Sequence, residues 1–335
     1  MKRLLYIGNK LSGHGNTVTA IETLGNLLES NGYNLRYASS KKNKVLRFAD
    51  MVWKTLRYSS QTDYVIIDTY STQNFWYTIA VSQLCRLLDL KYITILHGGN
   101  LPQRLSNNPL LCSLVFGNAY KNVAPSGYLL EAFRNKGFNT IYISNPLDDA
   151  ADFPYQQRNE IKPKLLWVRA FAPMYNPEMA LKTFAILKKQ FPDATLCMVG
   201  PDKGLMDKTK QSAAAQNLDV TFTGRLTKPE WAALSKNYDI FINTTQTDNA
   251  PFSIIEAAAL GLVIVSTNVG GIPHLLENRK SAMLVNHDDA EAMAGAVSEV
   301  ISNALLRQEL LRNSYDLVAR SDSNSVLEKW SEILI

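Results

Sequence analysis

The sequence predicts an α/β protein built from two doubly wound, Rossmann-like domains that face each other across a cleft. The first observation is length, because 335 residues is about twice a typical domain and favours two separate cores. The second is the alternation of short apolar strands with helical segments along the chain, which is typical of parallel sheets. The third is that polar or glycine-containing turns follow several strands, where such a sheet presents a small-molecule site.

The first domain is expected over residues 1–150. It opens with an apolar strand at Leu4–Gly8, and a glycine-rich loop follows at Asn9–Asn16. A helix is expected at Thr17–Ser30 because apolar residues recur there at helical spacing, and Gly32 ends it as glycine commonly does. Helical segments separate the other strands of this domain, which are expected at Asn34–Ala38, Tyr64–Asp68, Tyr92–Leu96, Asn122–Ala124 and Thr140–Ile143.

The second domain is expected over residues 151–319. It follows an interdomain connection at Asn145–Pro163, which contains three prolines and several acids. Beyond it, Ser325–Ile335 carries apolar residues at helical spacing and predicts a further helix. The strands of the second series are expected at Leu165–Val168, Thr195–Val199, Val220–Thr223, Ile240–Asn243, Val263–Ser266 and Ala282–Val285.

Composition is that of an ordinary soluble globular protein, with 46% hydrophobic and 19% charged residues. The three cysteines, Cys85, Cys112 and Cys197, are far apart in apolar runs, which predicts free thiols in a reducing compartment. The apolar run near the amino terminus is too short for a signal peptide, and no apolar stretch is long enough to span a bilayer. These features predict a cytoplasmic protein. The net charge of +5 favours anionic partners only mildly, no motif supports a nucleic-acid role, and no metal is implied.

The segment from Asn243 to Gly271 is the most informative in the chain. It places two acids, Asp248 and Glu256, on either side of a strand-to-helix turn, and it closes with two adjacent glycines. One interpretation is a capping box, in which Glu256 bonds back to the helix start near Ser253. That interpretation accounts for neither Asp248 nor the glycines, so a small-molecule site is favoured.

The spacing of these two acids resembles the donor-sugar motif of retaining glycosyltransferases of family 4, which have the GT-B architecture. In that family two glutamates are separated by seven residues, whereas Asp248 stands in the first position here. The resemblance implies an acceptor-side first domain, a nucleotide-sugar donor side in the second, and a carboxy-terminal helix at 320–335 that packs back on the first. Other segments match the family's order and spacing, namely Ile143–Leu147, Val199–Pro201, Phe222–Arg225 and Tyr238–Asn243.

The resemblance also implies roles for individual residues. Asp248 would hold hydroxyls of the donor sugar, and Glu256 would hold the ribose hydroxyls of the nucleotide. The family stabilises the departing diphosphate with an Arg and a Lys, without a metal or other cofactor. Arg169 is the nearest cation here and Tyr175 stands at the expected position of the Lys, so Arg225 or Lys228 is a candidate for additional charge. The remaining sugar and phosphate contacts are expected from the backbone around Asn249, Ala250, Pro251, Phe252 and Gly271.

A histidine and a glycine loop are the candidate site residues of the first domain. His97 ends an expected strand and precedes Gly98 and Gly99; the resemblance implies that it contacts the transferred sugar and the reacting phosphate. The loop that contains Gly13, His14, Gly15 and Asn16 precedes a helix and could bind an anion or acceptor group. Its glycine spacing is not a dinucleotide fingerprint, so a plain turn is an equal alternative.

The segment Lys41–Tyr58 combines basic residues with an apolar and aromatic set. A basic amphipathic helix of this kind is typical of a membrane-surface element that contacts anionic lipids. The alternative is a core helix with a solvated basic rim, and the sequence does not separate the two. The first interpretation would make the protein cytoplasmic but peripheral on the inner face of the cell membrane.

Three functions remain open at this point. The favoured one is a retaining glycosyltransferase that moves a sugar from a nucleotide-sugar donor to a lipid-linked or oligosaccharide acceptor, in the synthesis of cell-surface polysaccharide or glycolipid. The second is a sugar-nucleotide epimerase or hydrolase of the same fold. The third is a two-lobed sugar-binding module without catalysis, which the presence of Tyr175 in place of the usual Lys makes worth considering.

Overall fold

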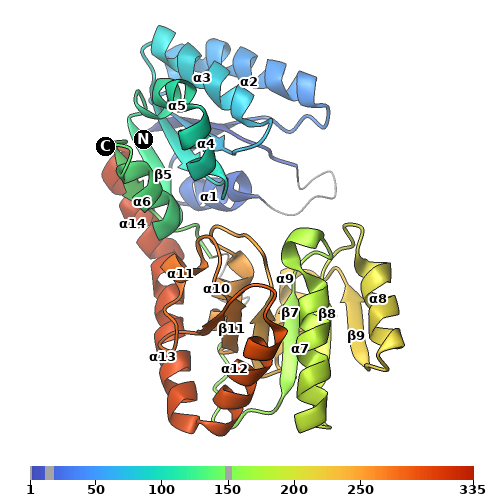
Figure 1. Ribbon diagram of the computed structural model, residues 1–335. Coiled ribbons are helices and arrows are strands. Elements are labelled where there is room, and N and C mark those ends of the chain that lie inside the picture. The colour runs from blue at the N-terminus through green and yellow to red at the C-terminus, as the bar shows by residue number, and fades with distance from the viewer. Residues whose placement is uncertain (1, 12–18, 148–152) are drawn as a thin grey trace. The chain divides into compact units, whose positions relative to one another are not determined.

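Figure 1 shows a computed structural model of the protein, which describes residues 2–11, 19–147 and 153–335. The chain divides into two compact units. Unit 1 contains Met1–Pro146 and Ser323–Ile335, and unit 2 contains Leu147–Asp322. Each unit holds a six-stranded sheet in which neighbouring strands are parallel, so the predicted fold class, two Rossmann-like domains of GT-B type, is confirmed.

The sheet of unit 1 has the strand order β2-β1-β3-β4-β5-β6. Successive strands are linked by helices, as parallel pairing requires. The strands are β1 (Arg3–Ile7), β2 (Asn34–Ala38), β3 (Tyr64–Thr69), β4 (Lys91–Leu96), β5 (Lys121–Ala124) and β6 (Thr140–Tyr142). The helices are α1 (Ala20–Ser30), α2 (Lys44–Tyr58), α3 (Phe75–Leu87), α4 (Leu101–Asn107), α5 (Pro109–Phe116), α6 (Gly127–Arg134) and α14 (Ser323–Ile333).

Helix α1 shows how local sequence sets an element of this unit. Thr19 caps it in a capping box, because the Glu22 carboxylate accepts from the Thr19 backbone N–H at 3.0 Å. At the other end Gly32 adopts a positive φ of 89°, as the sequence predicts for a residue that ends a helix.

The two faces of the unit 1 sheet bury alternate residues of each strand. Leu4 and Tyr6 of β1 point toward α1 and α14, whereas Leu5 and Ile7 point toward α2 and α3. This alternation is the period-two pattern of a strand buried on both faces. Helix α14, although last in sequence, therefore completes one of the two cores of unit 1, and its Trp330 is only 1% exposed.

The sheet of unit 2 has the strand order β12-β11-β10-β7-β8-β9. Two apolar clusters cover its faces, one with α7 and α12 and the other with α9 and α10. The strands are β7 (Lys164–Val168), β8 (Thr195–Val199), β9 (Val220–Gly224), β10 (Ile240–Asn243), β11 (Val263–Thr267) and β12 (Met283–Val285). The helices are α7 (Pro177–Gln190), α8 (Met206–Ala215), α9 (Lys228–Ser235), α10 (Phe252–Ala259), α11 (Ile272–Leu275), α12 (Ala290–Ser302) and α13 (Ala304–Ser321).

Two further expectations concern cysteines and membrane spans. Cys85, Cys112 and Cys197 are all free and buried, as predicted. Across the described ranges, no helix combines the length and the apolar character that crossing a bilayer requires.

Replacing Trp330 by alanine tests whether α14 is an integral part of unit 1. We expect Trp330→Ala to lower the free energy of unfolding by about 3–5 kcal/mol, the usual cost of removing a fully buried Trp side chain. Denaturant unfolding followed by circular dichroism measures the effect. Glu328→Ala, on the exposed side of the same helix, is the control, and equal stability of the two variants would contradict the assignment.

Candidate active site

The carboxyl ends of three neighbouring strands in unit 2 carry a connected set of polar side chains. Arg169 follows β7, Asn243 ends β10 and Ser266 lies near the end of β11. Arg169 Nε donates to Asn243 Oδ1 at 3.1 Å, and Asn243 Nδ2 donates to Ser266 Oγ at 2.9 Å. Because carboxyl ends of parallel strands meet at one edge of a sheet, this network lies where α/β proteins bind small molecules.

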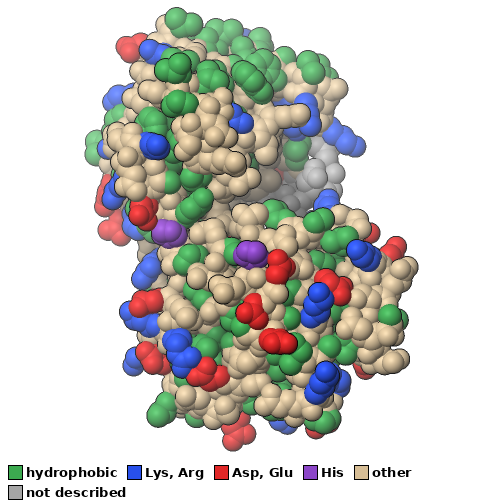
Figure 2. Space-filling view, viewed as in Figure 1, with side chains coloured by type: hydrophobic (Ala, Val, Ile, Leu, Met, Phe, Trp, Pro, Cys, Tyr) green, Lys and Arg blue, Asp and Glu red, His purple; other side chains and the backbone are tan. Residues whose placement is uncertain are grey.

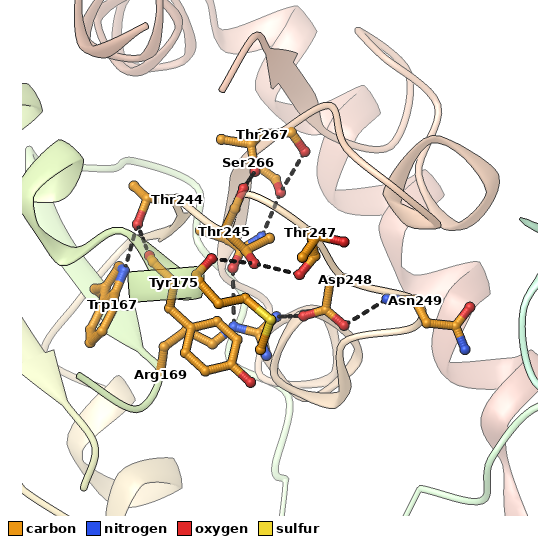
Figure 3. A network of polar contacts seen from close by, with 12 residues as sticks. Trp167, Arg169, Tyr175, Thr244, Thr245, Thr247, Asp248, Asn249, Ser266 and Thr267 are labelled. Carbon is orange, nitrogen blue, oxygen red and sulfur yellow. Dashed lines mark hydrogen bonds and ion pairs between the residues drawn. The ribbon is translucent and has the colours of Figure 1, made fainter. Parts of the chain in front are cut away.

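Arg169 also pairs with the first acid of the predicted motif. Its Nη2 lies 2.9 Å from Asp248 Oδ2, while Asp248 Oδ1 accepts a hydrogen bond from the Asn249 backbone N–H at 2.8 Å (Figure 3). The two side chains are only 11% and 18% exposed. Nη2 is nevertheless a buried donor without a hydrogen-bond partner in the described part of the chain, so its short contact with Asp248 is ionic and lacks hydrogen-bond geometry.

Tyr175 contacts Arg169 through its aromatic ring and supplies no charge of its own. The Arg169 guanidinium lies 5.0 Å from the centroid of the Tyr175 ring, a cation–π distance. The Tyr175 backbone is fixed in turn, because its carbonyl accepts from Thr244 Oγ1 at 2.8 Å and that oxygen accepts from Trp167 Nε1 at 2.9 Å (Figure 3). The residue at the position where the resemblance places a Lys thus holds the remaining cation in place.

Three glycines allow the loops of this edge to approach one another. A Cβ atom at Gly271 would lie 1.8 Å from the Asn249 carbonyl oxygen, and one at Gly270 would lie 2.1 Å from that of Asp248. On the other side, a Cβ at Gly200 would lie 1.8 Å from the Arg169 carbonyl oxygen. Only glycine permits such backbone contact, so the position of the Asp248 loop depends on the paired glycines that the sequence singled out.

The second acid of the motif, Glu256, forms a separate ion pair. Glu256 is buried on α10, and its Oε1 lies 3.2 Å from Lys228 Nζ at the start of α9. The capping-box interpretation of Glu256 is wrong, because α10 begins at Phe252 after Pro251 and places Glu256 in the second turn. No side chain caps α10, and Ser253 Oγ is buried without a hydrogen-bond partner in the described residues.

The structure thus brings most of the predicted donor-side residues together in two groups. Asn249, Ala250 and Pro251 form the loop between Asp248 and α10, and the Lys228 ammonium lies 5.9 Å from the Phe252 ring centroid. Arg225 is exposed directly after β9. The loop with Gly13, His14, Gly15 and Asn16 lies outside the described residues.

His97 belongs to unit 1, where it follows β4. Its Nε2 lies 2.9 Å from Asp68 Oδ1, and its side chain is 10% exposed. Asp68, near the end of the neighbouring strand β3, is completely buried. The predicted histidine is therefore one member of a carboxylate–histidine pair.

Sequence reasoning missed Asn243 and Asp68 as site residues. Both are polar residues at the ends of buried strands, which was the available signal. Their partners come from other strands, so no local pattern connects them.

Comparison with known proteins identifies the family. The profile of the family Glycosyl transferases group 1 matches residues 148–317, just over half of the chain. The chain belongs to this family of transferases, so the predicted kinship with glycosyltransferases is confirmed.

Individual relatives are distant. An uncharacterized glycosyltransferase of Haemophilus influenzae is 27% identical over 157 residues, which cover 46% of this chain and 44% of that protein. An alpha-1,4-N-acetyl-D-galactosaminyltransferase of Campylobacter jejuni, whose name gives its substrate as a GalNAc-containing saccharide on diNAcBac-PP-undecaprenol, is 20% identical over 191 residues. Those residues cover 57% of this chain and 53% of that protein. The chain thus spans about half the length of these relatives.

Among solved structures, Anabaena HepE in complex with UDP has the same fold. The TM-score is 0.80 at 16% identity, and the match covers 100% of this chain and 99% of HepE.

Gly271→Ala tests the dependence of the site on backbone approach. We expect a loss of about 1–3 kcal/mol in the free energy of unfolding, as for other overpacked positions, because the Asp248–Asn249 loop must move. Gly295→Ala is the matched control, since a Cβ there meets no atom within 4 Å and alanine is the better residue inside helix α12. Thermal and denaturant unfolding of both variants provides the comparison, and equal behaviour would contradict the close approach.

Proposed function

We propose that this protein is a retaining glycosyltransferase that moves a sugar from a nucleotide-sugar donor to a lipid-linked or oligosaccharide acceptor. The observation that carries the proposal is the pair of acid–cation contacts in unit 2, Arg169 with Asp248 and Lys228 with Glu256. Membership of the glycosyl transferases group 1 family supports the reaction class. The UDP bound to HepE supports a nucleotide-containing donor, and the undecaprenol-linked substrate of the Campylobacter relative supports a lipid-linked acceptor.

The donor's diphosphate needs positive charge as it departs. Arg169 offers a buried Nη2 that is ion-paired with Asp248 but makes no hydrogen bond within the described ranges, and the Lys228 side chain is one-third exposed. The start of α10 adds backbone N–H groups and the Ser253 hydroxyl, for which the described part of the chain supplies neither a side-chain cap nor a hydrogen-bond partner. These groups are chemically suited to phosphate oxygens.

The two carboxylates are suited to hydroxyl groups. When phosphate attracts Arg169 and Lys228, Asp248 and Glu256 gain capacity to accept hydrogen bonds from the donor's sugar and ribose hydroxyls, respectively. Positioning and charge stabilisation of this kind are the strongest means of catalysis when charge separates. His97 of unit 1 is proposed to contact the transferred sugar.

The proposed chemical step proceeds on one face of the sugar. The acceptor oxygen bonds to the anomeric carbon as the bond from that carbon to the phosphate oxygen breaks. The acceptor's proton passes to the leaving phosphate, so the protein need not provide a general base. Metal independence is part of the proposal because Arg169 and Lys228 supply positive charge.

A panel of nucleotide sugars tests the function directly. Nucleotide release should require both a suitable donor and an acceptor, with the anomeric configuration retained in the product by NMR, and it should persist in EDTA. Release without transfer would indicate a hydrolase, isomerised sugar nucleotide would indicate an epimerase, and binding without any reaction would indicate a sugar-binding module. Inverted product would overturn the retaining assignment.

Arg169→Ala should reduce turnover by about 10²-fold, the usual effect of losing one preorganised charge donor. The measurement is steady-state nucleotide release with saturating donor and acceptor. Arg279→Ala is the control. Arg279 also pairs with a carboxylate, that of Glu299 on α12, but it is exposed. Near-normal turnover of Arg169→Ala would remove Arg169 from the proposed machinery and direct attention to Arg225.

The acceptor side of the proposal includes an anionic membrane surface in contact with α2. This helix buries Arg47, Met51 and Thr55, so the interpretation of its apolar set as a core face is wrong. Most of that set is exposed, with Val45 at 75% and Trp53 at 53%. The helix's exposed large apolar residues are Val45, Leu46, Phe48, Trp53 and Leu56.

Neighbouring helices extend this apolar surface. Helices α2, α3 and α5 are adjacent, and hydrophobic side chains gather over this part of unit 1 (Figures 1 and 2). Trp76 and Leu87 of α3 and Leu110 of α5 are each more than 60% exposed. Basic residues at and before α2, including Lys41, Lys42 and Arg57, are also exposed, a combination that matches the apolar interior and anionic head groups of a bilayer surface.

Vesicle binding tests this surface. The protein should sediment with vesicles containing phosphatidylglycerol but much less with pure phosphatidylcholine, and high salt should weaken binding. The double variant Leu46→Ser, Trp53→Ser should bind at least several-fold more weakly because it loses buried apolar area on the membrane. Leu305→Ser, at a residue of unit 2 that is 80% exposed, should bind as the unmodified protein does; equal loss in both variants would overturn the assignment.

A further inference from the structure

Asp68 is the buried centre of a polar cluster in unit 1. Its side chain has no exposed surface, and two groups converge on Oδ1: Tyr6 Oη at 3.1 Å and His97 Nε2 at 2.9 Å. Tyr77 Oη donates to the backbone carbonyl of the same residue at 2.5 Å. Groups from β1 and the end of β4 thus contact the carboxylate, and a group from α3 contacts the backbone carbonyl of the same residue.

The neighbouring phenols remain donors. Burial, together with the negative charge of Asp68, raises the pKa of Tyr6 well above its ordinary value. Burial is also the main cause that raises the pKa of Tyr77, with smaller contributions from Tyr70 and Asp68. Oδ1 already accepts a hydrogen bond from the protonated Tyr6, so it acts as an acceptor. The short contact with His97 is therefore a hydrogen bond when Nε2 carries the ring proton and donates it.

The position of the His97 ring is fixed from several sides. Its backbone N–H donates to the Thr69 carbonyl at 2.9 Å, and the Tyr70 ring lies 5.4 Å away at 31°. Two glycines allow close approach beside the Asp68–His97 pair: a Cβ at Gly8 would lie 2.5 Å from Asp68 Oδ2, and one at Gly98, the residue after His97, would lie 2.5 Å from the Ser71 backbone nitrogen. Only Nε2 of the ring has a hydrogen-bond partner among the described residues.

We propose that Asp68 is a positioning residue that holds His97 in the Nε2–H tautomer, so that Nδ1 is presented as an acceptor for a sugar hydroxyl. The proposal rests on the proposed glycosyltransferase function for the identity of that hydroxyl. The tautomer itself depends only on the contacts within unit 1. A neutral ring held in this way accepts a hydrogen bond at Nδ1. In the other tautomer Nδ1 carries a proton, so it could not accept the hydrogen bond that the sugar hydroxyl donates.

Asp68→Asn separates orientation from packing because the side chains are nearly equal in size. The amide group can donate to Nε2 and thereby favour the Nδ1–H tautomer, as loss of the carboxylate does in other carboxylate–histidine pairs. We expect kcat/KM for the donor to fall about tenfold to hundredfold, the cost of one hydrogen bond to a ligand hydroxyl. Asp63→Asn, at a partly exposed residue that pairs with Arg3, is the matched control and should retain kcat/KM.

Nitrogen-15 NMR of histidine-labelled protein reads the tautomer without reference to activity. The chain has four histidines, and His97→Gln assigns the signal. The unmodified protein should show Nε2–H, Tyr6→Phe should keep it, and Asp68→Asn should change it. An Nδ1–H form in the unmodified protein would overturn the proposal even if Asp68→Asn failed to fold.

The kinetic and spectroscopic results separate two failures. A changed tautomer with unchanged kcat/KM would overturn the positioning role while leaving glycosyl transfer intact. An absence of transfer by the unmodified protein with every donor would instead overturn the proposed function, and the NMR result would still decide the Asp68–His97 geometry.

Discussion

The close backbone contact between the Asp248–Asn249 loop and Gly270–Gly271 is the constraint on which the unit 2 site depends. It brings a loop that follows β10 against one that follows β11, and the Gly271 N–H donates to the Asp248 carbonyl at 2.8 Å. With that loop fixed, the Asp248 carboxylate reaches Arg169 beyond β7. Gly200 provides the corresponding close approach to the Arg169 backbone. The geometry of the charged groups is thus set by backbone packing before any ligand arrives, which is the arrangement that electrostatic catalysis requires.

In both units, charged or titratable residues that the sequence predicts for the site have a partner in the protein itself. Arg169 pairs with Asp248, Lys228 with Glu256 and His97 with Asp68. A buried charge without such a partner would be costly, so pairing lets these groups occupy shielded positions in the protein without ligand. A ligand that carries both phosphate and hydroxyl groups matches the two halves of each unit 2 pair, because phosphate suits the cation and hydroxyls suit the acid. An anion alone would satisfy only the cations.

Much of the fold could be predicted from the sequence, because strand positions follow from apolar runs and their alternation with helices. The residues of the predicted donor-side motif could also be identified from the sequence, since they lie within one segment and resemble a known pattern. The buried face of α2 could not be predicted from the sequence. Helical periodicity shows which residues share a face, but the face that is buried here carries Arg47, Met51 and Thr55 and not most of the helix's apolar residues. Arg47 tolerates this position because its guanidinium donates to the Lys41 carbonyl at 3.2 Å.

The start of α10 illustrates a different limit. Ser253 and Glu256 have the spacing of a capping box, but Pro251 occupies the cap position and shifts the helix start by two residues. Asn243 and Asp68 were missed for a third reason, because their partners Ser266 and His97 lie 23 and 29 residues away in sequence. Such pairs are defined by strand order and register, and those are properties of the assembled sheet.

The place of α14 in unit 1 has a consequence for synthesis of the chain. Unit 2 is continuous in sequence from Leu147 to Asp322, whereas one core of unit 1 needs Val326 and Trp330 beside Leu4 and Tyr6. A ribosome adds about 5–20 residues per second, so roughly ten seconds or more separate the synthesis of β6 from that of α14. During this interval unit 2 can complete its own core, while Leu4, Tyr6 and their neighbours await the helix that covers them. The unit that is begun first is therefore finished last.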